Sequence, residues 1–160
     1  MDFYRIMLFL HILAVVVGLG ATFAYPFMQA TAERSGVPAT RFVLRAMLRI
    51  EHFVVYPGAA LIFLFGLGLI FSDQTGYDED FPGWLMWSIT WYVIAVGVGV
   101  LVQRRNIKRA LVVLDGAQDG DSLPAAYEPI SKQMQIVGGL LGLSVIGIAF
   151  LMVWGREGGF

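Results

Sequence analysis

The sequence contains no cysteine, only two histidines and few charged residues. Without cysteine there can be no disulfide, no thiolate metal site, no iron–sulfur cluster and no haem attached through a Cys-x-x-Cys-His motif. Charged residues make up only 14% of the chain, whereas hydrophobic residues make up 58%, a composition unlike that of a soluble globular domain. The composition therefore predicts an integral membrane protein.

Conventional catalytic motifs are also missing from the sequence. There is no Ser-His-Asp set, no carboxylate pair inside an apolar run, no glycine-rich phosphate loop and no zinc-like cluster. The basic residues are few and form no nucleic-acid-binding pattern. We therefore expect no catalytic residue, so that a cofactor would have to supply any chemistry.

Four apolar runs have the length of membrane spans. They cover residues 6–28, 53–71, 84–102 and 136–154, and a bilayer core about 30 Å thick needs about 20 apolar residues per helix. We expect the first run to be retained and not cleaved as a signal peptide, because Asp2 stands where such a peptide is basic. The prediction is an all-α, antiparallel bundle of four transmembrane helices in a single domain, residues 1–160. The expected helices cover roughly residues 4–31, 39–72, 82–114 and 126–155, and the second and third extend into the cytoplasm.

Positive charge is concentrated in two of the three connections. The first contains Arg34, Arg41, Arg45 and Arg49, and the third contains Arg104, Arg105, Lys108, Arg109 and Lys132. The positive-inside rule places both connections in the cytoplasm and both termini outside, and we expect the inner membrane of a bacterium. The lipid bilayer is an expected partner. This basic collar could bind anionic lipid headgroups or an acidic partner, or it could simply be solvated. Nucleic acid is not an expected partner.

Small residues recur inside the apolar runs at spacings that allow close helix packing. They are Ala14 and Gly18, Gly66 and Gly68, Gly97 and Gly99, and Gly138 and Gly142. They are compatible with a tight bundle, a homodimer face or a flat ligand lying against the backbone. Pro26 and Pro57, which each follow a tyrosine, predict kinks.

The two histidines lie at different expected depths. His11 is five residues inside the first run, whereas His52 precedes the second run at the cytoplasmic side. Their levels should differ by about 20 Å, which argues against one haem bound by both. Next to His52, Glu51 is expected to pair with Arg104 or Arg105, because an unpaired carboxylate near hydrocarbon is costly.

His11 has three competing interpretations. In the first, it hydrogen-bonds a hydroxyl of Ser88 or Tyr92. In the second, it is the axial ligand of a b-type haem, and in the third it belongs to a soft Cu(I) site. The candidate haem pocket comprises His11, Gly66, Ser88, Trp91 and Tyr92, and the candidate metal site comprises His11, Met7 and Met152, with Met86 nearby.

Three segments carry a resemblance to a known group of proteins. They are FLHILAVVVGLGATFAYPFM, VVYPGAALIFLFGLGLIF and the ending FLMVW. They resemble an uncharacterised family of four-helix integral membrane proteins that is grouped with copper-resistance protein D and the HemJ-type protoporphyrinogen oxidases. The resemblance to the HemJ type implies that His11, in its Leu10-His11 setting, is a haem-ligand candidate, with Pro57 and Gly66 also matched. The third run lacks the histidine of those enzymes, which weakens any expectation of protoporphyrinogen oxidation.

The sequence as a whole predicts a membrane protein without an established activity, most simply an accessory or structural membrane component. The leading alternative is b-type haem binding at His11, and the second is copper handling. The protein could act alone, as a homodimer or within a larger membrane complex.

Overall fold

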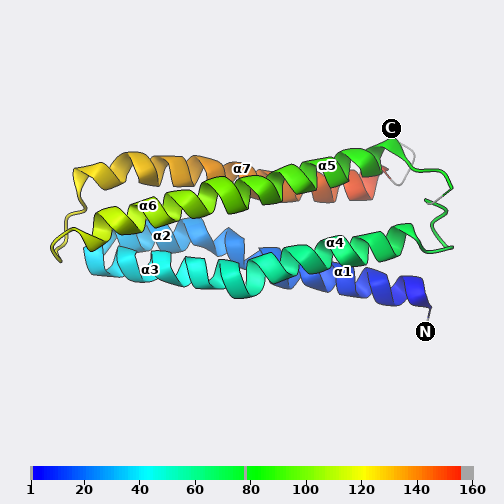
Figure 1. Cartoon of the computed structure of the whole chain (residues 1–160), viewed down its shortest axis with the longest axis horizontal. Coiled ribbons are helices and arrows are strands. Elements are labelled where there is room, and N and C mark those ends of the chain that lie inside the picture. Colours follow the sequence, from blue (N-terminus) through cyan, green and yellow to red (C-terminus); the bar gives the residue numbers. More distant parts are fainter. Residues whose placement is uncertain (1, 78, 156–160) are drawn as a thin grey trace.

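The computed structural model describes residues 2–77 and 79–155, and all regular structure in these ranges is helical. Four long helices comprise Phe3–Arg34, Val37–Ile70, Gly83–Asp115 and Ala125–Trp154, and each is long and apolar enough to cross a membrane. They run side by side in alternating directions (Figure 1). The prediction of an all-α protein with four membrane-length helices is confirmed.

Each long helix is assembled from shorter segments. The first contains α1 (Phe3–Gly20), the 3₁₀ turn η1 (Ala21–Ala24) and α2 (Tyr25–Arg34), and the second contains α3 (Val37–Ile50), the π turn η2 (Glu51–Val55) and α4 (Tyr56–Ile70). The third contains α5 (Gly83–Val98), the π turn η3 (Gly99–Gln103) and α6 (Arg104–Asp115), and the fourth contains the 3₁₀ turn η4 (Ala125–Tyr127) and α7 (Glu128–Trp154).

The helices are longer than a bilayer core requires. They contain 30 to 34 residues, which corresponds to about 45–51 Å at 1.5 Å per residue, against a core of about 30 Å. Phe3 and Trp154 lie at one end of the bundle, here called the terminal end, and the connections 35–36 and 116–124 lie at the other, here called the loop end (Figure 1). Part of each long helix therefore projects beyond the hydrocarbon.

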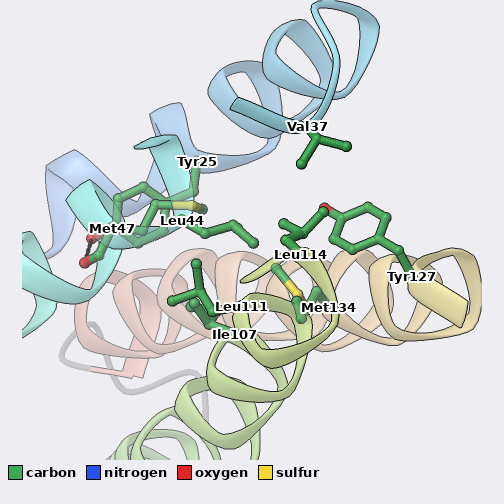
Figure 2. Packing of buried hydrophobic residues seen from close by; sticks show 10 residues of the cluster. Tyr25, Val37, Leu44, Met47, Ile107, Leu111, Leu114, Tyr127 and Met134 are labelled. Atoms are coloured by element: carbon green, nitrogen blue, oxygen red, sulfur yellow. Dashed lines mark hydrogen bonds between the residues drawn. The ribbon is translucent and has the colours of Figure 1, made fainter. Parts of the chain in front are cut away.

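The packed hydrophobic core lies at the loop end. Its buried side chains come mainly from α3 and α6, with contributions from the other two long helices (Figure 2): Tyr25, Val37, Leu44, Met47, Ile107, Ala110, Leu111, Leu114, Tyr127 and Met134. Together with the buried Thr40, most of these residues in α3 and α6 recur every three or four positions, which is the spacing of one helix face. By contrast, at most 22% of the residues in each 18-residue apolar window are buried, as expected where lipid surrounds the helices.

Within the apolar spans, glycines bring helices into close contact. A Cβ at Gly18 of α1 would lie 2.8 Å from the Cα of Gly58 in α4, and a Cβ at Gly147 of α7 would lie 2.6 Å from the Trp91 ring of α5. Helix association in lipid relies on such close packing because lipid chains are as apolar as the side chains. For these glycines the structure supports the tight-bundle interpretation.

The two prolines coincide with irregular turns. Pro26 is the second residue of α2, which follows the 3₁₀ turn, and Pro57 is the second residue of α4, which follows the π turn. A proline has no N–H to donate to the preceding turn, so the helix changes its hydrogen-bonding pattern there. The irregular turns also offset the two helices. The two helices share the Gly18–Gly58 contact and the Tyr25–Met47 hydrogen bond. Between these two contacts the second helix contains more residues than the first.

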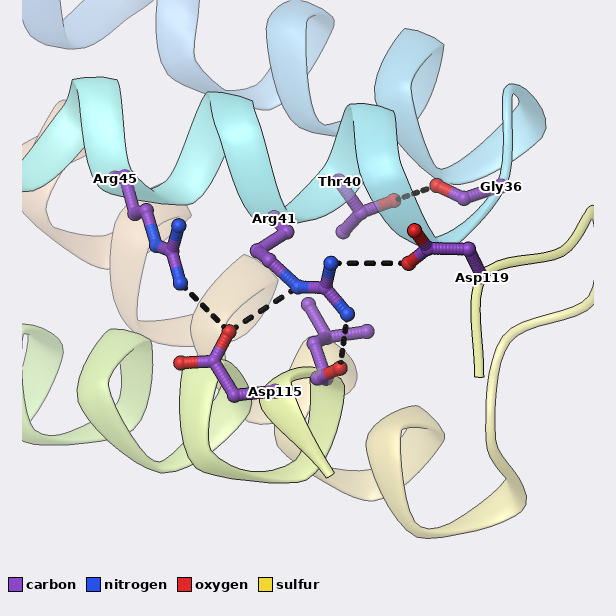
Figure 3. A network of polar contacts seen from close by, with 7 residues as sticks. Gly36, Thr40, Arg41, Arg45, Asp115 and Asp119 are labelled. Atoms are coloured by element: carbon purple, nitrogen blue, oxygen red, sulfur yellow. Dashed lines mark hydrogen bonds and ion pairs between the residues drawn. The ribbon is translucent and has the colours of Figure 1, made fainter. Parts of the chain in front are cut away.

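An arginine fixes the long connection at the loop end (Figure 3). Arg41 of α3 contacts Asp115 with Nε at 3.1 Å and Asp119 with a terminal nitrogen at 3.0 Å, and it donates to the carbonyl of Leu114 at 2.6 Å. On the other side of the turn, the N–H of Val37 donates to the carbonyl of Gly120 at 2.9 Å. The 116–124 connection is therefore bound to the start of α3.

Candidate functional site

His11 is buried between α1 and α4. Its side chain is 8% exposed, and Nδ1 lies 2.9 Å from the carbonyl oxygen of Ile62. A carbonyl can only accept, so the Nδ1–H of His11 donates this hydrogen bond. Gly66 makes this approach feasible, because a Cβ there would lie 3.3 Å from the imidazole.

The predicted hydroxyl partner of His11 is wrong. Ser88 donates to the carbonyl of Trp84 at 2.8 Å, one turn back in its own helix, and Tyr92 donates to the carbonyl of Ala59 at 2.6 Å. A serine inside an apolar helix satisfies its donor locally in this way, and the longer tyrosine reaches across to α4. Both hydroxyls are thus bound to carbonyls, as is His11.

A cavity of about 60 Å³ lies beside His11. Gly66, Ser88, Tyr92 and Met152 line it together with His11, as do Ile62, Phe63, Leu67, Ile70, Leu85 and Ile89. The structure therefore brings together four of the five residues of the candidate haem pocket.

Trp91, the fifth, is not part of the cavity lining. Its ring packs against Gly147 of α7, and its Nε1 donates to the hydroxyl of Ser144 at 3.1 Å. Ser88 and Tyr92 are four residues apart and share a helix face, whereas Trp91 faces α7.

The candidate metal residues are only partly gathered. Met152 lines the cavity, but Met7 packs its sulfur against Gly68, where a Cβ would lie 2.8 Å from it. Met86 is exposed. Among the described residues there is no group of three or more His, Cys, Asp or Glu side chains that could hold a metal ion.

The size of the cavity decides which ligands fit. Sites for drug-sized ligands and cofactors occupy about 300–1,000 Å³, whereas the space beside His11 is about 60 Å³. A haem does not fit between these residues as they are packed. The space suits a few water molecules or a single ion with its ligands.

Glu51 lies in a second polar region, at the π turn between α3 and α4. It is 6% exposed and accepts a hydrogen bond from the hydroxyl of Tyr56 at 3.2 Å. The guanidinium of Arg104 lies 5.7 Å from the centre of the Tyr56 ring. The predicted pairing of Glu51 with Arg104 or Arg105 is not a direct salt bridge in the described structure, although Arg104 interacts electrostatically with the carboxylate.

The Glu51 carboxylate thus bonds the Tyr56 phenol, while Arg104 lies over that ring and Arg105 is exposed. The neighbouring His52 is exposed, and its ring contacts the Phe53 ring edge-on, with 4.8 Å between the ring centroids.

A third polar cluster, around Glu33, escaped the sequence analysis. One oxygen of Glu33 accepts hydrogen bonds from Gln29 at 2.8 Å, Tyr127 at 2.8 Å and Ser131 at 2.6 Å. These bonds tie α2 to the start of the fourth helix. The four-residue spacing of Gln29 and Glu33 was the only local signal.

Comparisons with known proteins give a family and no characterised relative. No curated protein and no solved structure matches the chain. A family model matches residues 5–155, nearly the whole chain and all four long helices. The chain belongs to the family described as predicted integral membrane protein (DUF2269).

Proposed function

We propose that this protein is an accessory or structural component of the membrane, in which His11 locks the first two helices together. The observation that carries the proposal is the hydrogen bond from His11 Nδ1 to the Ile62 carbonyl, made where Gly66 leaves room for the ring. A polar side chain in lipid needs such a partner. The role assigned to His11 is therefore structural.

An absorption spectrum together with a His11→Ala variant tests this proposal. The purified protein, from haem-replete cells, should show no Soret band. His11→Ala should lower the thermal stability, because it removes this hydrogen bond, worth about 1 kcal/mol, and the packing of a buried ring. Each kcal/mol lost should lower Tm by about 2–4 °C. A Soret band that disappears in His11→Ala would support haem binding instead.

The haem alternative rests on the resemblance to the HemJ type. This resemblance rests on Leu10-His11, Pro57 and Gly66. On those residues alone we propose kinship with that group and with copper-resistance protein D. The 60 Å³ cavity does not accommodate a haem. The Soret measurement therefore decides between this alternative and the structural role.

Copper handling is a second candidate, favoured by one observation. Ligating histidines usually donate their other ring N–H to a carbonyl or carboxylate, as His11 does to Ile62, and Met152 supplies a soft sulfur on the cavity wall. A Cu(I) ion suits such ligands. Metal analysis should then find stoichiometric copper that is lost in His11→Ala and Met152→Leu, whereas copper-free protein from copper-supplemented cells would exclude it.

We also propose that the basic collar at the loop end binds anionic lipid headgroups. Five exposed cations make no ion pair in the described part of the chain: Arg34, Arg49, Arg105, Lys108 and Arg109. Native mass spectrometry should show bound phosphatidylglycerol that decreases in an Arg105→Gln/Lys108→Gln variant. Arg5→Gln, at the terminal end, is the matched control.

The orientation, the membrane and the assembly state belong to the same proposal. The loop end would face the cytoplasm and both termini the outside of a bacterial inner membrane, in keeping with its basic residues. Gly97 and Gly139 have no neighbouring atom within 4 Å of an added Cβ. They leave a small-residue surface for a homodimer or a larger membrane complex.

A further inference from the structure

The buried stripes of α3 and α6 change from apolar to polar as they approach the membrane spans. On α3 the buried residues Val37, Thr40, Leu44 and Met47 are followed by Glu51, and on α6 the buried residues Leu114, Leu111 and Ile107 are followed by Asn106 and Gln103. Glu51 is 6% exposed, Asn106 2% and Gln103 8%. Glu51, Asn106 and Gln103 are here called the polar layer.

Two observed contacts bracket the pairing of Glu51 with Asn106. Nearer the loop end, Arg41 bonds the carbonyl of Leu114. Nearer the terminal end, Arg104 lies over the ring of Tyr56. Glu51 lies between Arg41 and Tyr56 on one helix, and Asn106 lies between Arg104 and Leu114 on its antiparallel neighbour. Both side chains are buried, and the two contacts place them at the same level of the bundle.

The polar layer has unused hydrogen-bonding capacity. Asn106 Nδ2 and Gln103 Oε1 are buried without a partner, although Gln103 Nε2 donates to the carbonyl of Met134 at 3.2 Å. Glu51 accepts one hydrogen bond, on Oε2, whereas a carboxylate has about four acceptor sites. A buried donor without a partner is costly and is usually satisfied by a bound molecule.

We propose that the polar layer binds a hydroxyl group that accepts from Asn106 Nδ2 and donates to the Glu51 carboxylate. A hydroxyl is the smallest group with both capacities. It can belong to a water molecule or to the glycerol headgroup of a phospholipid. From Glu51 to Phe71, at the far end of the apolar run, the helix rises by about 30 Å. Glu51 therefore lies at the level where headgroups meet the hydrocarbon.

A double-mutant cycle tests the bridge through the sign of the change in Tm that Asn106→Leu causes. Thermal unfolding is measured for the full chain in phosphatidylcholine nanodiscs with Asn106→Leu, Glu51→Leu and both changes. If a hydroxyl bridges the two side chains, Asn106→Leu should lower Tm by about 2–4 °C, and the effect should vanish in the Glu51→Leu background. If the Asn106 donor has no partner, replacing it with a leucine of similar volume should raise Tm in both backgrounds. A rise, or an equal fall in both backgrounds, overturns the proposal.

Lipid composition distinguishes the two sources of the hydroxyl. If the effects of Asn106→Leu and Glu51→Leu on Tm are coupled in phosphatidylcholine nanodiscs, the hydroxyl belongs to water. If they are coupled only in phosphatidylglycerol nanodiscs, the hydroxyl belongs to the headgroup. If Glu51→Leu does not fold, infrared spectra provide a second measurement. A water band of the unmodified protein should shift on exchange into H₂¹⁸O and be lost in Asn106→Leu, or a headgroup hydroxyl band should depend on Asn106 in phosphatidylglycerol. Spectra unchanged by Asn106→Leu in both lipids overturn the proposal.

Discussion

Gly18 is the residue whose size matters most directly for the packing of the first two helices. An added Cβ would lie 2.8 Å from the Cα of Gly58, a backbone atom that cannot rotate away. We expect Gly18→Ala to destabilise the protein by about 1–3 kcal/mol, the usual cost of overpacking. Gly20→Ala is the control, because nothing lies within 4 Å of a Cβ there. Tm values in nanodiscs compare the two, and equal values would mean that the close contact is not retained in the membrane.

The neighbours of His11 show how far the sequence leads at the scale of single residues. Counting the helical rise along antiparallel helices brings Gly66, Ser88, Tyr92 and Met152 to its level, and all four line its cavity. The hydrogen-bond partner could not be predicted in this way. The Ile62 carbonyl belongs to a helix, where carbonyls normally bond the N–H four residues on, and Gly66 leaves room for the imidazole to approach it. Trp91 was misplaced because depth does not reveal which face of a helix a residue occupies.

The Arg41 cluster is the feature that joins elements at the loop end. Arg41 bonds two carboxylates and one carbonyl with its side chain 19% exposed, whereas Arg45 reaches only Asp115 with its side chain 56% exposed. Arg41→Lys keeps the charge but loses the planar fork. We expect a loss of about 1.5–3 kcal/mol and faster proteolysis within residues 116–124. Arg45→Lys should change stability by less than about 1 kcal/mol, and similar results for both variants would contradict the assigned role of Arg41.

The long helices were predictable as elements, but their internal irregularities were not. The four apolar runs predict spans by length alone, and Pro26 and Pro57 predict that two of them bend. The sequence gives no signal for a π turn at 51–55 or 99–103, although Pro57 follows the first of them. The hydrogen bond from Tyr56 to Glu51 spans five residues across the first of these turns, and charges counted along the sequence do not reveal it.

At the scale of the whole molecule, the absence of native cysteine makes the proposed orientation directly measurable. Gln74 lies in the exposed connection at the terminal end, and Asp121 lies in the exposed connection at the loop end. A membrane-impermeant maleimide should label Gln74→Cys on intact spheroplasts and Asp121→Cys only after permeabilisation. The unmodified chain contains no thiol and gives the background. The opposite pattern would place the basic loop end outside.

The π turn η2 determines which way Glu51 of the polar layer faces. Each residue of a helix turns the chain by about 100°, so deleting one residue from η2 would rotate all of α3 relative to α4. The buried Glu51 stripe would then turn away from the interior of the bundle while the Gly18–Gly58 contact held α4 in place. The π turn therefore sets the rotation of α3 relative to α4. With this rotation α3 packs its apolar face into the loop-end core while α4 keeps Gly58 against Gly18.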